Sequence, residues 1–124
     1  MSALPAPWVL AIDTVAVLVF TAVGRASHAE TSPVLGVLAT AWPFLAGLAA
    51  GWCVVLLRSR AAPRTVAGGI PVWFSTVTVG MLLRVAAGRG VAVSFVVVAT
   101  VVLGAFLLGW RALAALVGRR QARP

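Results

Sequence analysis

Hydrophobic and polar positions divide the chain into four long apolar runs separated by short breaks rich in Arg, Ser, Gly and Pro. A helix rises about 1.5 Å per residue, so roughly 20 apolar residues are enough to cross the hydrocarbon of a bilayer. Gly, Pro and Ser clusters between such runs are typical of loops. The pattern therefore predicts transmembrane helices over residues 4–24, 34–57, 66–85 and 91–110, followed by a basic tail over residues 111–124. It also allows the last helix to continue beyond its span to Val117.

Composition supports a membrane protein over a water-soluble one. Hydrophobic residues make up 62% of the chain, charged residues only 10%, and the mean hydropathy is +1.10. Soluble domains carry about a quarter charged residues, and this chain has too few polar groups to cover a core facing water. Short connections make successive helices antiparallel, so we predict one all-α domain, a four-helix antiparallel bundle in the membrane.

The net charge of +8 comes from ten Arg, no Lys and two acids. The arginines sit mainly at the ends of apolar runs, which favours the bilayer and its anionic lipid headgroups as partners over nucleic acid. Seven of them lie in the second loop or the C-terminal tail, and three in the other two loops. The positive-inside rule then predicts that both termini are cytoplasmic. Four tryptophans near the same ends are interpreted as anchors at the membrane interface: Trp8, Trp52, Trp73 and Trp110.

An acid, Asp13, lies well inside the first apolar run. A charged side chain there costs about 3 kcal/mol on insertion scales, so it should face the bundle and be paired, hydrated or protonated. Counting residues along each helix places Thr78 at a similar depth, and Arg111 is the best cationic partner. Two interpretations are open: a buried structural ion pair, or an intramembrane site for a proton or cation.

A second polar group lies at the opposite ends of the helices, formed by Arg25, His28, Glu30, Arg84 and Arg89. Arg25 and Arg84 could bind an anion in two-point fashion. Alternatively, these residues anchor helix ends to headgroups and form salt bridges with Glu30. One His and one Glu are too few for a metal site, so we predict no metal and no cofactor.

Small residues recur at helical spacing and predict close helix packing. Gly47 and Gly51 form a GxxxG pair, and Pro43 in the same run predicts a kink. The full set of predicted packing positions is Gly36, Thr40, Gly47, Gly51, Gly80 and Gly104.

Catalytic patterns are missing from the sequence. It has no nucleophile with a base at workable spacing and no phosphate-binding loop, and its only cysteine, Cys53, lies in an apolar run. We therefore expect a protein that is not an enzyme.

Four segments of the chain carry a family resemblance: Ala11–His28 (AIDTVAVLVFTAVGRASH), Thr40–Gly47 (TAWPFLAG), Val79–Arg84 (VGMLLR) and Ser94–Arg111 (SFVVVATVVLGAFLLGWR). Together they resemble a family of small four-span bacterial and archaeal membrane proteins, domain of unknown function 3054. The resemblance implies the fold and a multi-pass location in a bacterial or archaeal cytoplasmic (inner) membrane, but no activity. Its landmarks would fall on Asp13, Arg25, His28, Pro43, Arg84 and Arg111.

Two functional hypotheses follow. The first is a transporter or channel for a small solute or ion, working as a homo-oligomer with Asp13 as its charged site. The second is a non-catalytic accessory or assembly subunit of a larger membrane complex, whose small-residue faces bind partner helices.

Overall fold

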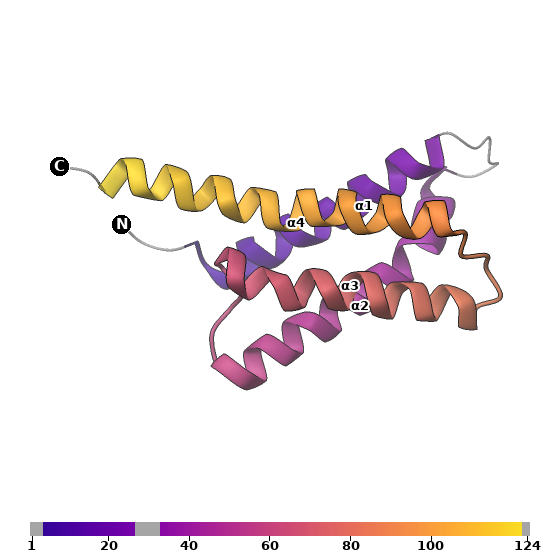
Figure 1. Cartoon of the computed structure of the whole chain (residues 1–124), viewed down its shortest axis with the longest axis horizontal. Coiled ribbons are helices and arrows are strands. Elements are labelled where there is room, and N and C mark those ends of the chain that lie inside the picture. The colour runs from indigo at the N-terminus through magenta and orange to yellow at the C-terminus, as the bar shows by residue number, and fades with distance from the viewer. Residues whose placement is uncertain (1–3, 27–32, 123–124) are drawn as a thin grey trace.

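The computed structural model describes residues 4–26 and 33–122, and within them it contains four α-helices and no strand. The helices are α1 (Ala6–Ala26), α2 (Pro33–Ser59), α3 (Val66–Ala86) and α4 (Val93–Ala122). Figure 1 shows that the start of α1, the end of α4 and the connection between α2 and α3 lie towards the same end of the molecule.

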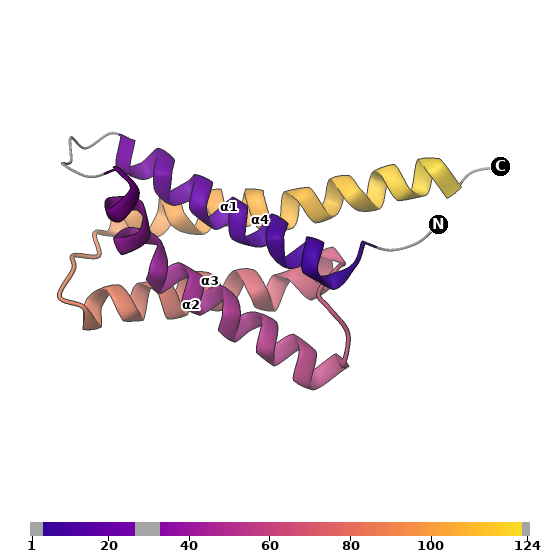
Figure 2. The same cartoon turned by 180° about the vertical axis from the view of Figure 1, so that it is seen from behind.

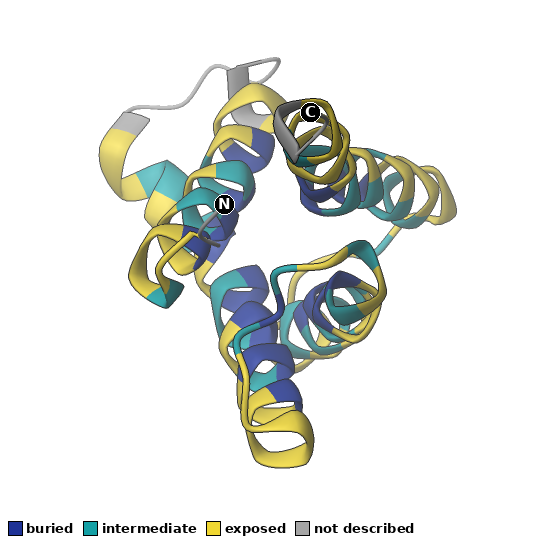
Figure 3. Cartoon of the chain, turned by 90° about the vertical axis from the view of Figure 1, so that its left-hand side faces the viewer, coloured by how far each residue is buried: buried dark blue, intermediate teal, exposed yellow. Residues whose placement is uncertain are grey.

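Each helix contains a segment long and apolar enough to cross a membrane, as expected for a multi-pass membrane protein. These segments are Ala6–Gly24, Val34–Ser59, Val66–Ala86 and Val93–Arg120. Figure 3 shows the buried residues on the inward faces of the helices and the exposed ones on the outside. Many of the exposed residues are Leu, Val, Phe and Trp, which suits an outer surface that contacts lipid.

Local sequence explains where the helices begin and end. At the start of α1, the backbone N–H groups of Trp8 and Val9 donate to the carbonyl of Pro5. Thr65 caps α3, because its hydroxyl accepts a hydrogen bond from the N–H of Gly68 at 2.9 Å. After α3 the backbone turns at Gly88, whose φ of 78° is one that glycine adopts without steric cost.

The fourth helix extends well beyond its predicted span of residues 91–110. It continues past Val117, the limit that the sequence allowed, and ends at Ala122 within the predicted basic tail. The run from Arg111 to Val117 contains Ala, Leu and Arg, which are good helix formers, and no Pro or Gly interrupts it. Consequently Arg111 lies inside a helix and is fully buried, whereas Arg119 and Arg120 are exposed in the last turns.

The interface between α2 and α3 is the most extensive in the bundle, and glycine makes it possible. A Cβ added to Gly47 would lie 2.8 Å from the backbone oxygen of Ser75, and one added to Gly51 would lie 2.9 Å from the Cα of Val72. The Ser75 hydroxyl also donates to the Gly47 carbonyl at 2.8 Å. These glycines let the two backbones come into direct contact, so α2 and α3 are the most closely packed pair of helices. Among the helix pairs in contact, α1 and α4 share the smallest interface.

Other predicted packing positions also lie against large side chains. A Cβ on Gly80 would lie 2.5 Å from the Phe44 ring, and one on Gly104 would lie 3.1 Å from the Trp73 indole nitrogen. Gly36 and Thr40 are only half-buried in the first turns of α2. Figure 2 shows that α2 bends within its first half, the half that contains Pro43.

Candidate functional site

Asp13 and Arg111 form a two-point ion pair between α1 and α4. Arg111 Nη1 donates to Asp13 Oδ1 at 2.8 Å, and Nη2 donates to Oδ2 at 2.7 Å. Neither side chain has any exposed surface. The planar guanidinium matches the carboxylate in this fork geometry, which gives strong, directional hydrogen bonds.

Two tryptophans complete the environment of the carboxylate. Trp52 Nε1 on α2 donates to Asp13 Oδ2 at 2.8 Å, and Trp110 Nε1 on α4 donates to Oδ1 at 2.9 Å. Each carboxylate oxygen therefore accepts two hydrogen bonds from N–H groups of the described residues. An ionised carboxylate offers about four lone-pair positions, so the acceptor capacity of Asp13 is filled.

The guanidinium of Arg111 is held on its remaining sides as well. Its Nε donates to the carbonyl of Pro63 at 2.8 Å, and Nη1 also donates to the carbonyl of Leu107 at 2.8 Å. Its plane lies over the Trp110 ring, with Cζ 4.8 Å from the ring centroid. Arg111 thus binds the connection between α2 and α3 at the same time as it pairs with α1.

A glycine on α3 makes room for the stem of this arginine. A Cβ at Gly69 would lie 2.6 Å from Arg111 Cδ and 2.9 Å from its Nε. No residue larger than glycine fits unless the arginine moves. The site thus contains one residue from each of the four helices: Asp13, Trp52, Gly69 and Arg111.

This arrangement is suited to holding the bundle together. Taking two charges out of water is costly, and the cost is repaid only when geometry is good and the other donors and acceptors are satisfied. These conditions are largely met here. The pair is bidentate, both carboxylate oxygens also accept from indole N–H groups, and four of the five guanidinium N–H groups donate to described acceptors. A cation or proton could reach the carboxylate only by replacing one of these donors.

A comparison with known protein families identifies the chain. The sequence model of the family described as "Protein of unknown function (DUF3054)" matches residues 10–114. The chain belongs to this family. The match confirms the resemblance seen in the sequence, and the DUF3054 region contains both Asp13 and Arg111. Searches of curated proteins and of solved structures return no match to the chain.

In this DUF3054 protein, Thr78 is not part of the site, which corrects the prediction from residue depth. Thr78 is exposed on α3, whereas Thr76 is fully buried and donates to the carbonyl of Val72. Counting residues gives height along a helix, but each residue also turns the side chain by about 100°. Height alone therefore cannot identify which side chain faces the interior.

The predicted interface tryptophans make hydrogen bonds that the sequence did not reveal. Trp52 is 6% exposed, Trp110 is half-buried, and both donate to Asp13. Trp73 donates to the carbonyl of Thr100 at 3.0 Å. Trp8 is 64% exposed. The sequence held one usable signal: a buried indole needs an acceptor, and Asp13 is an acceptor within the membrane.

The predicted polar group at the other end is only partly described. His28 and Glu30 lie outside the described residues, as does the side chain of Arg25. Arg84 Nη2 donates to the carbonyl of Gly90 at 3.0 Å, and its guanidinium stacks on Phe95 with Cζ 4.5 Å from the ring centroid. Within the described part of the chain, its Nε is buried without a partner.

Arg89, the remaining member of that group, is exposed after α3. Its backbone N–H donates to the carbonyl of Arg84 at 2.9 Å, within the turn that follows the helix. Residues 4–26 and 33–122 contain no cluster of His, Cys, Asp and Glu that could hold a metal ion.

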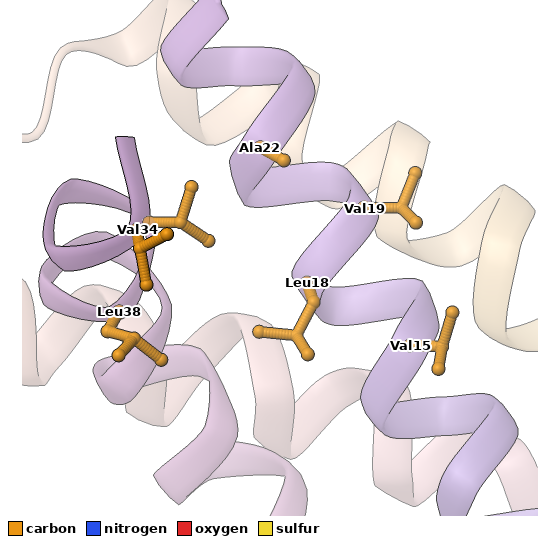
Figure 4. A pocket seen from close by; sticks show the side chains of 7 residues that line it. Val15, Leu18, Val19, Ala22, Val34 and Leu38 are labelled. Carbon is orange, nitrogen blue, oxygen red and sulfur yellow. The ribbon is translucent and has the colours of Figure 1, made fainter. Parts of the chain in front are cut away.

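Shallow apolar grooves lined by described residues lie on both sides of α1. The α1/α2 groove, of about 470 Å³, runs between α1 and the first turns of α2. Figure 4 shows Leu18, Val34 and Leu38 turned into it. The α1/α4 groove, of about 510 Å³, is lined by Ile12, Val15, Ala16 and Val19 of α1 and by α4 residues between Ala105 and Leu113. Val15 and Val19 line both grooves and form the ridge between them.

Proposed function

We propose that this protein is a non-catalytic accessory subunit of a larger membrane complex, and that the Asp13–Arg111 pair stabilises its fold. The saturated carboxylate is the observation that supports this proposal. Asp13 accepts four hydrogen bonds from N–H groups of described residues, and both charges of the pair are fully buried. A membrane charge used in this way stabilises a bundle and offers no free ligand to a solute.

Transport through Asp13 stays a prediction, and it would require a rearrangement of the buried pair. A transported cation would have to displace Arg111 or one of the two indoles from the carboxylate, leaving a buried donor without a partner. The accessory hypothesis needs no such rearrangement, and for this reason we favour it.

The predicted docking surface needs revision under the same proposal. Gly47, Gly51, Gly80 and Gly104 pack against residues of this chain and are not available to another helix. Partner contact would instead use outward positions such as Phe74 on α3, which is 65% exposed, and Val101 on α4, which is 63% exposed.

The accessory role can be tested by photo-crosslinking in living cells. A photoreactive amino acid at Phe74 or Val101 should crosslink the full chain to the same integral membrane protein in every preparation. The matched control is Val72, two residues from Phe74 on α3 and fully buried, which should give no intermolecular product. Products limited to lipid or to the chain itself at both outward positions would contradict the proposal.

A flux assay separates the two hypotheses. The purified chain in liposomes should show no proton or cation flux above protein-free vesicles. If flux is present, and if Asp13→Glu alters its pH dependence while the protein stays folded, the transport hypothesis replaces the accessory one.

The antiparallel arrangement, the cytoplasmic termini and the bacterial or archaeal cytoplasmic membrane belong to the same proposal. The excess of Arg beside the α2–α3 connection and at the end of α4 supports the cytoplasmic termini, and the short connections between helices support the antiparallel arrangement. The lone cysteine makes a labelling test simple, since Cys53→Ala gives a cysteine-free chain. A new cysteine at Arg119 should react with an impermeant thiol reagent only after the membrane is permeabilised. One at Arg89 should react in intact cells, and the reverse pattern would overturn this orientation.

A further inference from the structure

The α1/α4 groove lies between two membrane-crossing segments whose direct interface is the smallest in the bundle. Its lining includes the small residues Ala16, Ala105 and Gly109. A Cβ added at Gly109 would meet no heavy atom of the described chain within 4 Å. The groove is therefore open space with apolar walls in a part of the molecule that faces hydrocarbon, and an extended acyl chain has matching chemistry.

The wall formed by α4 continues beyond the groove to a positive charge. Leu113 is the last lining residue on this helix, and exposed Leu116 and Val117 follow it at helical spacing. Arg120 comes seven residues after Leu113, close to two full turns, so it lies on the same face of α4. Arg119 is rotated by about 100° from that face. Both arginines are exposed.

The wall formed by α1 ends near an exposed tryptophan. Trp8 precedes Ile12 by four residues, which places it on the groove side of α1 one turn beyond the lining, and it is 64% exposed. Figure 2 shows the start of α1 and the end of α4 at the same end of the molecule. An exposed indole and an exposed guanidinium thus flank the same end of the groove.

The charged residues near this end of the groove favour a lipid with an anionic headgroup. Asp13, the acid nearest to the groove on α1, is buried and already paired with Arg111. Among the described residues, none of the groove walls carries an acid. A phosphate at the level of Arg120 would accept charge-assisted hydrogen bonds from the guanidinium.

We propose that the α1/α4 groove is a binding site for an anionic phospholipid, with one acyl chain between α1 and α4 and the phosphate on Arg120. This site does not depend on the accessory role proposed above. The α1/α2 groove shares Val15 and Val19 with this groove, but it extends to Ala22 and the first turns of α2, away from the end of α4 (Figures 1 and 4).

Native mass spectrometry of the full chain in detergent tests the headgroup. Phosphatidylglycerol and phosphatidylcholine with identical acyl chains are titrated separately. Arg120→Gln should weaken phosphatidylglycerol binding about fivefold and leave phosphatidylcholine binding unchanged. Arg119→Gln is the matched control, with the same change of charge off the groove face, and should have a clearly smaller effect. Equal losses for both variants would show diffuse attraction to a basic helix end and overturn the site.

The acyl chain is tested by filling the groove. Gly109→Phe should lower binding of both lipids, whereas Val101→Phe, an equally bulky change at an exposed position outside the lining, should not. Lipid binding unchanged in Gly109→Phe would overturn the proposal. The proposal would also be overturned if the unaltered chain forms dimers and Gly109→Phe abolishes them, because a second copy of the chain would then occupy the groove. If Gly109→Phe fails to fold, the Arg120→Gln and Arg119→Gln pair still decides the question.

Discussion

Arg111 and Arg84 are the same residue type near opposite ends of one bundle, yet their surroundings differ. Arg111 is fully buried and its guanidinium binds a carboxylate and two backbone carbonyls. Arg84 is half-buried, stacks on Phe95 and donates to one carbonyl, and its Nε has no partner among the described residues. No described acid pairs with Arg84.

The contrast shows two ways in which a small membrane bundle accommodates a guanidinium. A fully buried one needs a counter-charge and a complete set of acceptors, because an unpaired charge there is very costly. A guanidinium near a helix end can extend towards the membrane surface. There it needs fewer partners, and an aromatic ring with one carbonyl is enough. Arg111 should therefore be essential to the fold, and Arg84 should be dispensable for it.

The largest effect is expected from removing one partner of the buried pair. Asp13→Leu or Arg111→Met should each lower the free energy of unfolding by about 3–5 kcal/mol, because the remaining charge is left buried. The double variant should lose less than either single one. SDS-induced unfolding in mixed micelles measures all three, and a double variant whose loss equals the sum of the singles would show that the two residues act independently.

A smaller loss is expected when one indole donor is removed. Trp52→Phe deletes a hydrogen bond to a charged group and should cost about 1.5–3 kcal/mol in the same unfolding experiment. Trp8→Phe is the control, since Trp8 is 64% exposed and is not among the described donors to Asp13. Equal stability of the two variants would mean that the Trp52 hydrogen bond does not support Asp13.

Crowding the stem of Arg111 should destabilise the bundle by a similar or smaller amount. Gly69→Ala places a Cβ 2.6 Å from Arg111 Cδ, and we expect a loss of about 1–3 kcal/mol as the guanidinium shifts. Gly109→Ala adds the same methyl group to open space and should be close to neutral. If both variants unfold at the same detergent fraction, Gly69 is not a packing constraint on the pair.

The smallest effect is expected at Arg84. Arg84→Met keeps an apolar stem and loses the stacking on Phe95, worth about 1 kcal/mol or less at a partly exposed position. Its unfolding curve should nearly coincide with that of the unaltered chain, in contrast to Arg111→Met. A loss as large as that of Arg111→Met would mean that Arg84 has a counter-charge, and Glu30 would be the first residue to substitute.

The amino-acid sequence by itself determined the all-α class and the four helices that are long and apolar enough to cross a membrane. Long apolar runs bounded by polar breaks are local features, and the free energy of placing them in hydrocarbon depends little on their neighbours. It also determined that Asp13 must be satisfied within the bundle, because an isolated charge in lipid is costly for any arrangement of helices.

Only the tertiary structure decided which side chains meet the carboxylate. The hydrogen bonds of the pair with Trp52, Trp110 and the carbonyl of Pro63 depend on how each helix is rotated and on the path of the α2–α3 connection. The depth of a residue along its helix gives neither of these. The same rotation turns Thr78 outward and buries Thr76. Apolar runs this uniform have weak amphipathic patterns, so their sequence does not show which face of each helix is buried. Close contacts, such as those of Gly47, Gly51 and Gly69, select the inward faces. These contacts form only when the helices pack.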